Sequence, residues 1–418
     1  MERRKERILL CLCHLSGNEQ KFVNEAFETN WVVPLGPNVN GFEKELEEFV
    51  GQNKRVVALS AGTAAVHLAL LACGVGPGDE VLVQSFTFCA SSHPITYLGA
   101  TPVFVDSEKE TWNMDPELLE EAIKDRIAKT GKKPKAIVPV ALYGMPYKIE
   151  QIMAIANKYG IPVVEDAAEG FGSKFNGQVL GTFGKYGVLS FNGNKMITTS
   201  GGGALITENE DEWREIMMYA TQYRESYPYY QHEKIGYNYR MSNICAGIGR
   251  GQMTILNEHI AHHKKVQKLY EELLKDVKGV TVHSQPETGE YDSNYWLCTI
   301  TLDPSVKVKG LENAYKQIVT GAVGGAAGVI HAASSAITDC QPNDNVEAMR
   351  MGLDALNIES RPLWKPMHKQ PVYKNAPAYV NGVSEDLFKV GMCLPAGPYV
   401  TEDDVHFIVD AIKSLIIA

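Results

Sequence analysis

Residues 161–173 read IPVVEDAAEGFGS, a short apolar run that ends in two adjacent carboxylates, Glu165 and Asp166. Such a run is typical of a buried strand in a parallel sheet that has helices on both faces. In that architecture ligands bind beyond the carboxyl ends of the strands. A carboxylate at this point of the chain is therefore a candidate functional group.

Similar apolar runs alternate with helix-like patterns from about residue 38 to 220. This alternation predicts an α/β fold with a mostly parallel sheet. The predicted strands are 56–59, 81–83, 102–105, 136–140, 163–164 and 188–191, and the predicted helices between them are 63–73, 90–98, 116–127 and 148–158.

The pattern changes after a long helix that we predict over about 243–275. One hydrophobic core rarely serves 418 residues, so we expect two domains. These are a large α/β domain over 1–275 and a smaller C-terminal α+β domain over 276–418. Within the smaller one, residues 321–335 (GAVGGAAGVIHAASS) have no charge and no clear period. We expect a loop there; a tightly packed helix pair and an insertion covering the active site are the alternatives.

Composition narrows the classes of function. The net charge of −10 is spread without long blocks, so we expect no nucleic-acid partner. No stretch approaches the ~20 apolar residues of a membrane span, so we expect no membrane partner either. The eight cysteines lack the spacing of a metal site, so no metal is expected, and scattered thiols suit the cytoplasm.

Lys195 lies in the stretch 190–203, SFNGNKMITTSGGG, directly after a predicted strand. Its amine could form a Schiff base with an aldehyde once it loses its proton. The alternative is an ordinary surface lysine. Asp166 could then pair with the pyridine nitrogen of pyridoxal 5′-phosphate (PLP) and keep that ring protonated. The alternative for Asp166 is a cap on the next helix.

Two further strand ends carry candidate cofactor contacts. At 58–74, Gly62 and Thr63 begin an Ala/Leu-rich helix whose amino end would suit a phosphate, although such a turn is often only structural. At 85–92, strand alternation would point only one of Phe86 and Phe88 toward a ring, and the alternative is that both lie in the core.

In this order the motifs resemble the DegT/DnrJ/EryC1/StrS family of sugar aminotransferases, which are PLP enzymes of fold type I. The likeness covers about 14–275 and 356–416 and leaves the Gly/Ala-rich stretch near 305–343 unmatched. The motifs that carry it are WVVPLGPNVNGFE at 31–43, SAGTAAVHLAL at 60–70, SFTF at 85–88, PVFVD at 102–106, EDAAE at 165–169, SFNGNK at 190–195, GYNYRMSN at 236–243 and ESRPLWKPMH at 359–368.

The resemblance implies roles for individual residues. Lys195 would bind the PLP aldehyde and Asp166 the ring nitrogen, and these two would be the catalytic pair. Phe88 would stack on the ring. The full set of implied cofactor contacts is Gly62, Thr63, Phe88, Asp166, Glu169, Ser190, Lys195 and Asn238, and the implied substrate contacts are Pro34, Leu35, Gly36, Asn192 and Arg361.

The resemblance also implies the reaction. Glutamate would give its amino group, through PLP, to the 4-keto carbon of a nucleotide-linked 4-keto-6-deoxy sugar. Glu169 stands where much of the family has Gln or His, and EDAAE resembles the branch that acts on UDP-linked 4-keto-6-deoxy-N-acetylglucosamine. A PLP sugar dehydratase is a rival, but in that branch His replaces the lysine. A catalytically silent binding or regulatory protein on the same fold is the other rival.

The stretch 236–243 bears on assembly. By resemblance, Asn238 would reach the PLP phosphate of a neighbouring subunit, which implies a homodimer with shared active sites. The residues alone leave another possibility: a turn that caps the next helix through Ser242 or Asn243.

Overall fold

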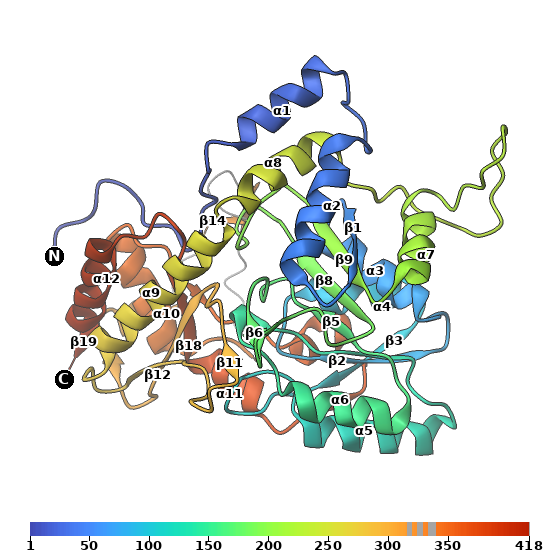
Figure 1. Cartoon of the computed structure of the whole chain (residues 1–418). Coiled ribbons are helices and arrows are strands. Elements are labelled where there is room, and N and C mark those ends of the chain that lie inside the picture. The colour runs from blue at the N-terminus through green and yellow to red at the C-terminus, as the bar shows by residue number, and fades with distance from the viewer. Residues whose placement is uncertain (316–319, 324–328, 333–339, 418) are drawn as a thin grey trace.

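A large central sheet organises the greater part of the molecule (Figure 1). The computed structural model describes residues 1–315, 320–323, 329–332 and 340–417. Two four-stranded sheets, β1-β9-β8-β5 and β17-β3-β2-β4, meet where β4 and β5 form parallel bridges, one of them between Val140 and Asp166. The strands are β1 (Arg55–Leu59), β2 (Glu80–Gln84), β3 (Thr101–Val105), β4 (Ala136–Val138), β5 (Val164–Asp166), β8 (Tyr186–Ser190), β9 (Gly203–Thr207) and β17 (Ala378–Tyr379).

The predicted α/β fold with a mostly parallel sheet is confirmed. Neighbouring strands of the sheet pair in parallel, except that β9 runs antiparallel to both β1 and β8. The sequence prediction missed β9, whose residues GALIT follow a run of glycines. Because β9 opposes both neighbours, β1 and β8 point the same way and end at the same edge of the sheet.

Helices cover both faces of the sheet, because alternate strand residues are buried on opposite sides. Val56 and Ala58 of β1 belong to one hydrophobic core, whereas Val57 and Leu59 belong to the other. The helices packed on the first face are α2 (Pro37–Val50), α5 (Pro116–Thr130) and α6 (Ile149–Tyr159), and those on the second are α3 (Gly62–Ala72), α4 (His93–Tyr97) and α7 (Glu210–Ala220).

The single long helix predicted over 243–275 is wrong. Two helices, α8 (Asn243–Met253) and α9 (Leu256–Leu274), occupy this region. The first ends because Thr254 bonds back to the Gly251 carbonyl through both its amide and its hydroxyl, and Ile255 then leaves helical backbone angles. Glycines in α8 also let α1 (Glu19–Glu28) and α2 pack closely against it.

A second sheet, β10-β12-β18-β16, forms a smaller unit with helices α10 and α12 (Figure 1). Its core includes Val266, Tyr270 and Leu274 of α9 and also Ile8, so residues before 276 contribute to it. The elements here are β10 (Val280–Val282), β12 (Cys298–Leu302), α10 (Asp344–Ala355), β16 (Arg361–Pro362), α11 (Val383–Val390), β18 (Gly391–Leu394) and α12 (Glu402–Leu415). The remaining strands are β6 (Lys174–Phe175), β7 (Gln178–Val179), β11 (Tyr291–Asp292), β13 (Lys307–Val308) and β19 (Ile416–Ile417).

The structure describes only part of the stretch 321–335, for which we expected a loop. Residues 324–328 and 333–335 of that stretch lie outside the described residues. The described parts form β14 (Thr320–Val323) and β15 (Val329–Ala332), which pair antiparallel where a loop was expected. Elsewhere, no helix among the described residues combines the length and the apolarity that crossing a membrane requires.

Candidate active site

The ends of β1 and β8 meet at one edge of the sheet. Gly203 of β9 pairs with Leu59 on one side and with Ser190 on the other, so these two strand ends flank it. The neighbouring strand β5 runs parallel to β8 and ends in Asp166. Residues that follow β1, β5 and β8 are thereby brought together, as expected for ligand binding at the carboxyl edge.

Gly62 and Ser190 form a close approach at this edge. A Cβ added to Gly62 would lie 3.0 Å from the Cβ and 3.3 Å from the Oγ of Ser190. Helix α3 begins at Gly62, and no side chain caps its amino end. Its first amides, with the hydroxyls of Thr63 and Ser190, are therefore available to an anion such as a phosphate.

Asp166 is a buried carboxylate at the end of β5. Its Oδ2 accepts a hydrogen bond from Ser91 Oγ at 2.6 Å, and its Oδ1 accepts one from the Ala168 amide at 3.1 Å. Burial raises the pKa of this carboxyl, and the Ser91 hydrogen bond opposes that rise. A turn rather than a helix follows β5, so the alternative role of Asp166 as a helix cap does not apply.

Lys195 lies against Glu169. The Nζ of Lys195 is 3.4 Å from Glu169 Oε1, and Glu169 Oε2 accepts a hydrogen bond from the Tyr143 amide at 2.7 Å. Burial raises the pKa of the Glu169 carboxyl, and the Lys195 charge opposes that rise. The same charge also acts on the Asp166 carboxyl. Lys195 is only 14% exposed in its side chain, unlike an ordinary surface lysine.

Phe86 and Phe88 do separate, but strand alternation is not the reason, because residues two apart share a strand face and both residues lie beyond β2, which ends at Gln84. Phe86 is fully buried in the core, whereas Phe88 is 48% exposed. The Phe88 ring lies 5.2 Å from the Trp364 ring, and the Trp364 amide donates to Tyr143 Oη at 2.9 Å. Phe88 thus has a free aromatic face beyond the end of β2, beside a segment of the smaller unit.

These groups fit PLP. The uncapped helix end and two hydroxyls suit its phosphate, and the half-exposed Phe88 suits its ring. Asp166 forms no salt bridge with any described residue, so a buried carboxylate is left without a cation. A protonated pyridine nitrogen would supply that cation, and Lys195 would supply the amine for the aldehyde.

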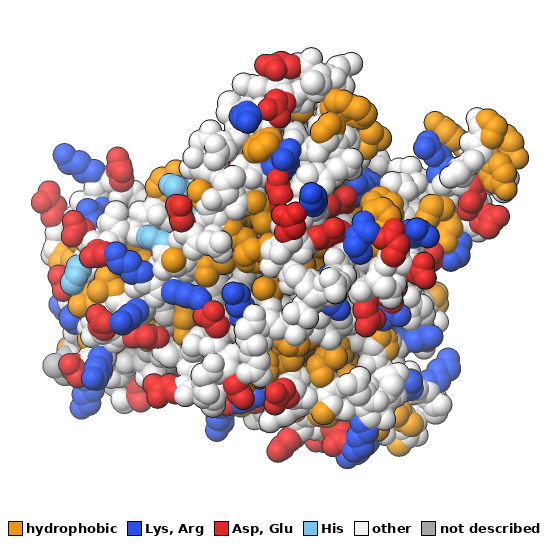
Figure 2. Space-filling model, viewed as in Figure 1, with side chains coloured by type: hydrophobic (Ala, Val, Ile, Leu, Met, Phe, Trp, Pro, Cys, Tyr) orange, Lys and Arg blue, Asp and Glu red, His pale blue; other side chains and the backbone are white. Residues whose placement is uncertain are grey.

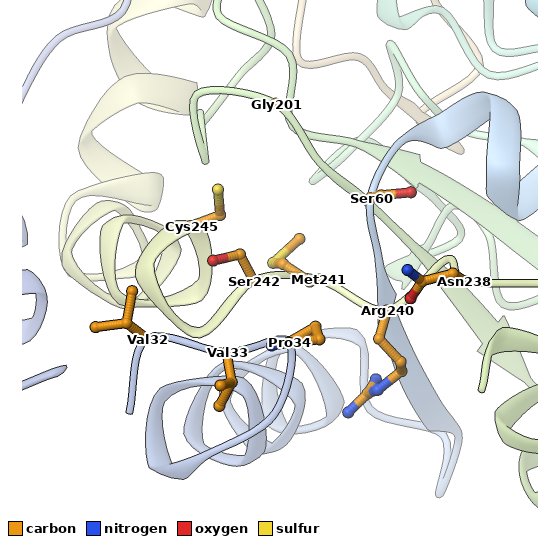
Figure 3. A pocket seen from close by; sticks show the side chains of 10 residues that line it. All are labelled: Val32, Val33, Pro34, Ser60, Gly201, Asn238, Arg240, Met241, Ser242 and Cys245. Carbon is orange, nitrogen blue, oxygen red and sulfur yellow. The ribbon is translucent and has the colours of Figure 1, made fainter. Parts of the chain in front are cut away.

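A pocket lies beside this region and contains part of the predicted site (Figure 3). Its volume is about 390 Å³, and Pro34 and Asn238 both line it. Asn238 and Ser60 lie together on one side, where the Ser60 amide donates to the Tyr239 carbonyl at 2.8 Å. The other lining residues are Val32, Val33, Gly201, Arg240, Met241, Ser242 and Cys245. Neither Lys195 nor Asp166 is among them.

The neighbours of Pro34 are held by α8. Gly36, with φ +137°, begins α2, and a Cβ there would lie 2.8 Å from Asn243 Oδ1. Leu35 is 54% exposed. Ser242 caps α8, as one alternative for this stretch predicted, since its Oγ accepts from the Ile244 amide. Asn238 takes no part in that cap, and its side chain is exposed.

Two predicted substrate residues lie apart from this pocket. Asn192 is exposed, and its carbonyl accepts from the Lys195 amide at 3.0 Å, so it belongs to the lysine loop. Arg361 is half exposed and pairs with Glu359, whose other oxygen accepts from the Leu10 amide. The structure thus places Arg361 beside the amino-terminal segment.

Sequence reasoning missed several residues of the site. Ser91 stands in the quoted stretch 85–92, and Tyr143 follows β4, so both had a local signal. Trp296 had none, because it reaches Lys195 from a distant part of the chain. The buried pair Arg240–Glu43 was also missed, although both residues stand in the motifs quoted above. Among the described residues, no group of three or more His, Cys, Asp or Glu side chains could hold a metal ion.

A sequence model of a protein family matches most of this chain. The model described as the DegT/DnrJ/EryC1/StrS aminotransferase family matches residues 14–323 and 309–413. The two matches overlap at 309–323 and so extend into the stretch near 305–343 that the motifs alone leave unmatched.

Individual proteins give the same result. EpsN of Bacillus subtilis, named as a pyridoxal phosphate-dependent aminotransferase, is 42% identical over 98% of this chain and 96% of its own length. A GDP-perosamine synthase of Caulobacter vibrioides is 33% identical over 98% of this chain and 99% of its own length. Among solved structures, a DegT DnrJ EryC1 StrS aminotransferase from Brucella abortus matches with a TM-score of 0.80 and 28% identity, over 95% of each chain.

Proposed function

The chain belongs to the DegT/DnrJ/EryC1/StrS aminotransferase family, and from this membership we propose that it transfers the amino group of glutamate to the 4-keto carbon of a nucleotide-linked 4-keto-6-deoxy sugar. It is a PLP-dependent aminotransferase. The observation that carries the residue assignment is the convergence of Lys195, Asp166 and the uncapped start of α3 at one edge of the sheet.

PLP supplies an aldehyde that exchanges amines and a ring that accepts electrons. The amine of Lys195 would hold the aldehyde, and when free it would move a proton, as general base and then as general acid. The carboxylate of Glu169, 3.4 Å away, orients that amine.

Asp166 keeps the ring nitrogen protonated. It is buried and, among the described residues, accepts hydrogen bonds from Ser91 and Ala168 alone, so it retains the capacity to bind one more donor. Phe88 positions the ring, and Gly62, Thr63 and Ser190 bind the phosphate at the start of α3. These contacts fix the cofactor without taking part in proton transfer.

For the nucleotide and the sugar of the substrate, we propose identities that membership of the family does not by itself determine. The EDAAE motif favours a UDP-linked N-acetyl sugar, through Glu169. Relatives named GDP-perosamine synthase, from three organisms, support a C4 amination of a GDP-linked sugar equally well. One relative, a UDP-2-acetamido-2-deoxy-3-oxo-D-glucuronate aminotransferase, is named for a 3-oxo sugar instead.

A substrate panel tests the proposal. Purified protein loaded with PLP is incubated with glutamate and one keto sugar at a time: UDP-, GDP- or dTDP-linked 4-keto-6-deoxy sugars, or a UDP-linked 3-keto sugar. We expect amino-sugar product and 2-oxoglutarate in equal amounts with a 4-keto substrate, and a UDP-linked N-acetyl sugar to be preferred. Turnover of the 3-keto sugar alone would contradict the proposed position of amination.

We also propose that the protein acts in the cytoplasm as a homodimer, with the division into domains at 275/276. The exposed Asn238 and the open pocket beside Pro34 support the dimer, since an outward-facing contact residue needs a second chain to complete it. Arg361 and the segment Pro34-Leu35-Gly36, with Asn192, are the proposed contacts of the sugar nucleotide.

A further inference from the structure

Trp296 contacts the lysine loop at two points. The Nζ of Lys195 lies over the indole ring, 4.0 Å from its centroid. The indole Nε1 donates a hydrogen bond to the Asn194 carbonyl at 2.6 Å. One side chain, 2% exposed, therefore holds both the end of the lysine side chain and the backbone immediately before it.

Asn294 contacts the Glu169 loop in the same way. Its Nδ2 donates to the carbonyls of Glu169 and Phe171 at 2.9 and 3.0 Å, and its Oδ1 accepts from the Trp296 amide at 2.8 Å. Asn294 is fully buried. Its two side-chain groups thereby join the backbone of the Glu169 loop to the backbone of Trp296.

The backbone between them is in an uncommon conformation. Tyr295 has φ +49°, in the left-handed region that non-glycine residues adopt only at a cost. Gly144, with φ +95°, makes room for the segment: a Cβ there would lie 1.9 Å from Asn294 Oδ1. Such a costly turn persists where surrounding contacts determine it, which is frequent at functional sites.

We propose that Asn294 and Trp296 are positioning residues that together fix the amine of Lys195 against the carboxylate of Glu169. This inference rests on the proposed role of Lys195. Trp296 lies two residues before β12 of the smaller unit, so that unit sets the geometry of a lysine carried by the large one. The aromatic face holds the ammonium when Lys195 is free of the cofactor, and the Nε1 hydrogen bond fixes the turn that carries it.

Trp213 provides a matched control. Its Nε1 also donates to a backbone carbonyl, that of Val56, at 3.1 Å, and a cation, Arg55, lies over its ring at 4.6 Å. It belongs to α7 and packs on β1, away from the lysine loop. The variants are Trp296→Phe, which keeps an aromatic face and loses the hydrogen bond, Trp296→Leu, which loses both, and Trp213→Leu.

The test measures how fast Lys195 itself takes up PLP. Apo-protein is mixed with PLP, samples are reduced with borohydride over time, and the modified Lys195 peptide is quantified by mass spectrometry. We expect Trp296→Leu to label about tenfold more slowly than the parent, since a cation–π contact and a hydrogen bond are lost, with Trp296→Phe between them. In turnover, kcat should fall while the KM for the sugar stays unchanged.

Equal labelling rates in Trp296→Leu and Trp213→Leu would overturn the inference while leaving the role of Lys195 intact. If Trp296→Leu does not fold, Trp296→Phe decides, and a parent-like labelling rate and kcat for it would overturn the inference. If the parent protein is not labelled at Lys195 at all, the proposed function fails and the inference fails with it.

Discussion

The two groups of site residues at the edge of the sheet, one around Lys195 and one around Asn238, differ in how fully a single chain surrounds them. Around Lys195, Asp166 and Glu169, each carboxylate has defined partners within the same chain and is at least nine-tenths buried. Around Asn238 and Pro34, by contrast, the pocket is open and its key amide is exposed. The chain therefore surrounds the first group with its own residues and leaves the second group open to solvent.

The surface shows the same contrast. Exposed apolar side chains gather beside the open pocket, at Trp31, Val32, Val33 and Leu35. The segment between α7 and α8 projects from the body of the molecule and carries orange side chains in the space-filling view (Figures 1 and 2). Exposed rings on that segment are Tyr227, Tyr229 and Tyr230. Apolar surface of this kind commonly marks a protein contact, which supports a second chain at the group around Asn238.

The largest expected effect is at the centre of the group around Lys195. Lys195→Ala should abolish amino transfer and the visible absorbance of bound PLP, because it removes the amine that would hold the aldehyde. The fold should survive, since Lys195 contributes only a contact with Glu169 and Trp296. Circular dichroism and a transfer assay check both points, and turnover above trace level would refute the role of Lys195.

Asp166→Asn should have the next largest effect. The amide keeps the shape and the Ser91 contact but removes the charge that holds the ring proton. We expect the transfer rate to fall at least ~10²-fold, as is typical when a key catalytic group is lost. Ser91→Ala is the matched control, because it removes one hydrogen bond from the carboxylate without removing the charge. An Asn variant within a few-fold of the parent would leave Asp166 with a structural role only.

The group around Lys195 was largely predictable from sequence. Asp166 and Ser190 are the last residues of β5 and β8, and Gly62 and Lys195 stand in the segments that follow β1 and β8. Because these three strands point the same way, the topology brings the four residues together. The separation of Phe88 from Phe86 was expected for the wrong reason, because residues two apart share a strand face and both residues lie in the turn after β2. Site residues at the ends of strands, or in the segments just after them, could therefore be predicted from the sequence.

Contacts between distant segments were not predictable. Trp296 and Asn294 reach the site from about a hundred residues away, and no periodicity signals their direction. The break at Thr254 was missed because it depends on one hydroxyl bonding back to Gly251 rather than on a Gly or Pro. Sequence patterns report which residues share an element, but packing between elements decides these positions.

A mixing experiment tests whether a second chain completes the group around Asn238. Lys195→Ala and Asn238→Asp are each expected to be inactive as homodimers. Refolded together, about half of the dimers are mixed, and each mixed dimer has one site with both residues intact. We therefore expect recovery to about a quarter of the parent activity, measured by amino-sugar formation.

The control for this experiment mixes two variants that damage the same group. Lys195→Ala refolded with Asp166→Asn should restore far less, because both residues lie on one chain and every site in the mixed dimer lacks one of them. If the first mixture restores nothing while both variants dimerise, Asn238 acts within its own chain or not at all.

The smallest effect concerns acid stability and appears only as the pH falls. His263 of α9 is fully buried. Its Nδ1 contacts the Tyr295 carbonyl at 3.2 Å, and its Nε2 has no partner among the described residues. Burial lowers the pKa of His263 from 6.5 to about 3. Between these two values the unfolded chain binds a proton that the folded chain does not. The stability from the neutral ring is thus complete above pH 6.5 and is lost as the pH falls toward 3. From pH 7 to 4.5 this loss is roughly 2–3 kcal/mol in the free energy of unfolding.

His263→Phe removes the titrating group and should flatten the decline by that amount in urea unfolding. His232→Phe, in the exposed projecting segment, should leave the decline as in the parent, because it leaves the buried His263 ring in place. Equal slopes in all three proteins would show that acid does not act on the group around Lys195 through His263.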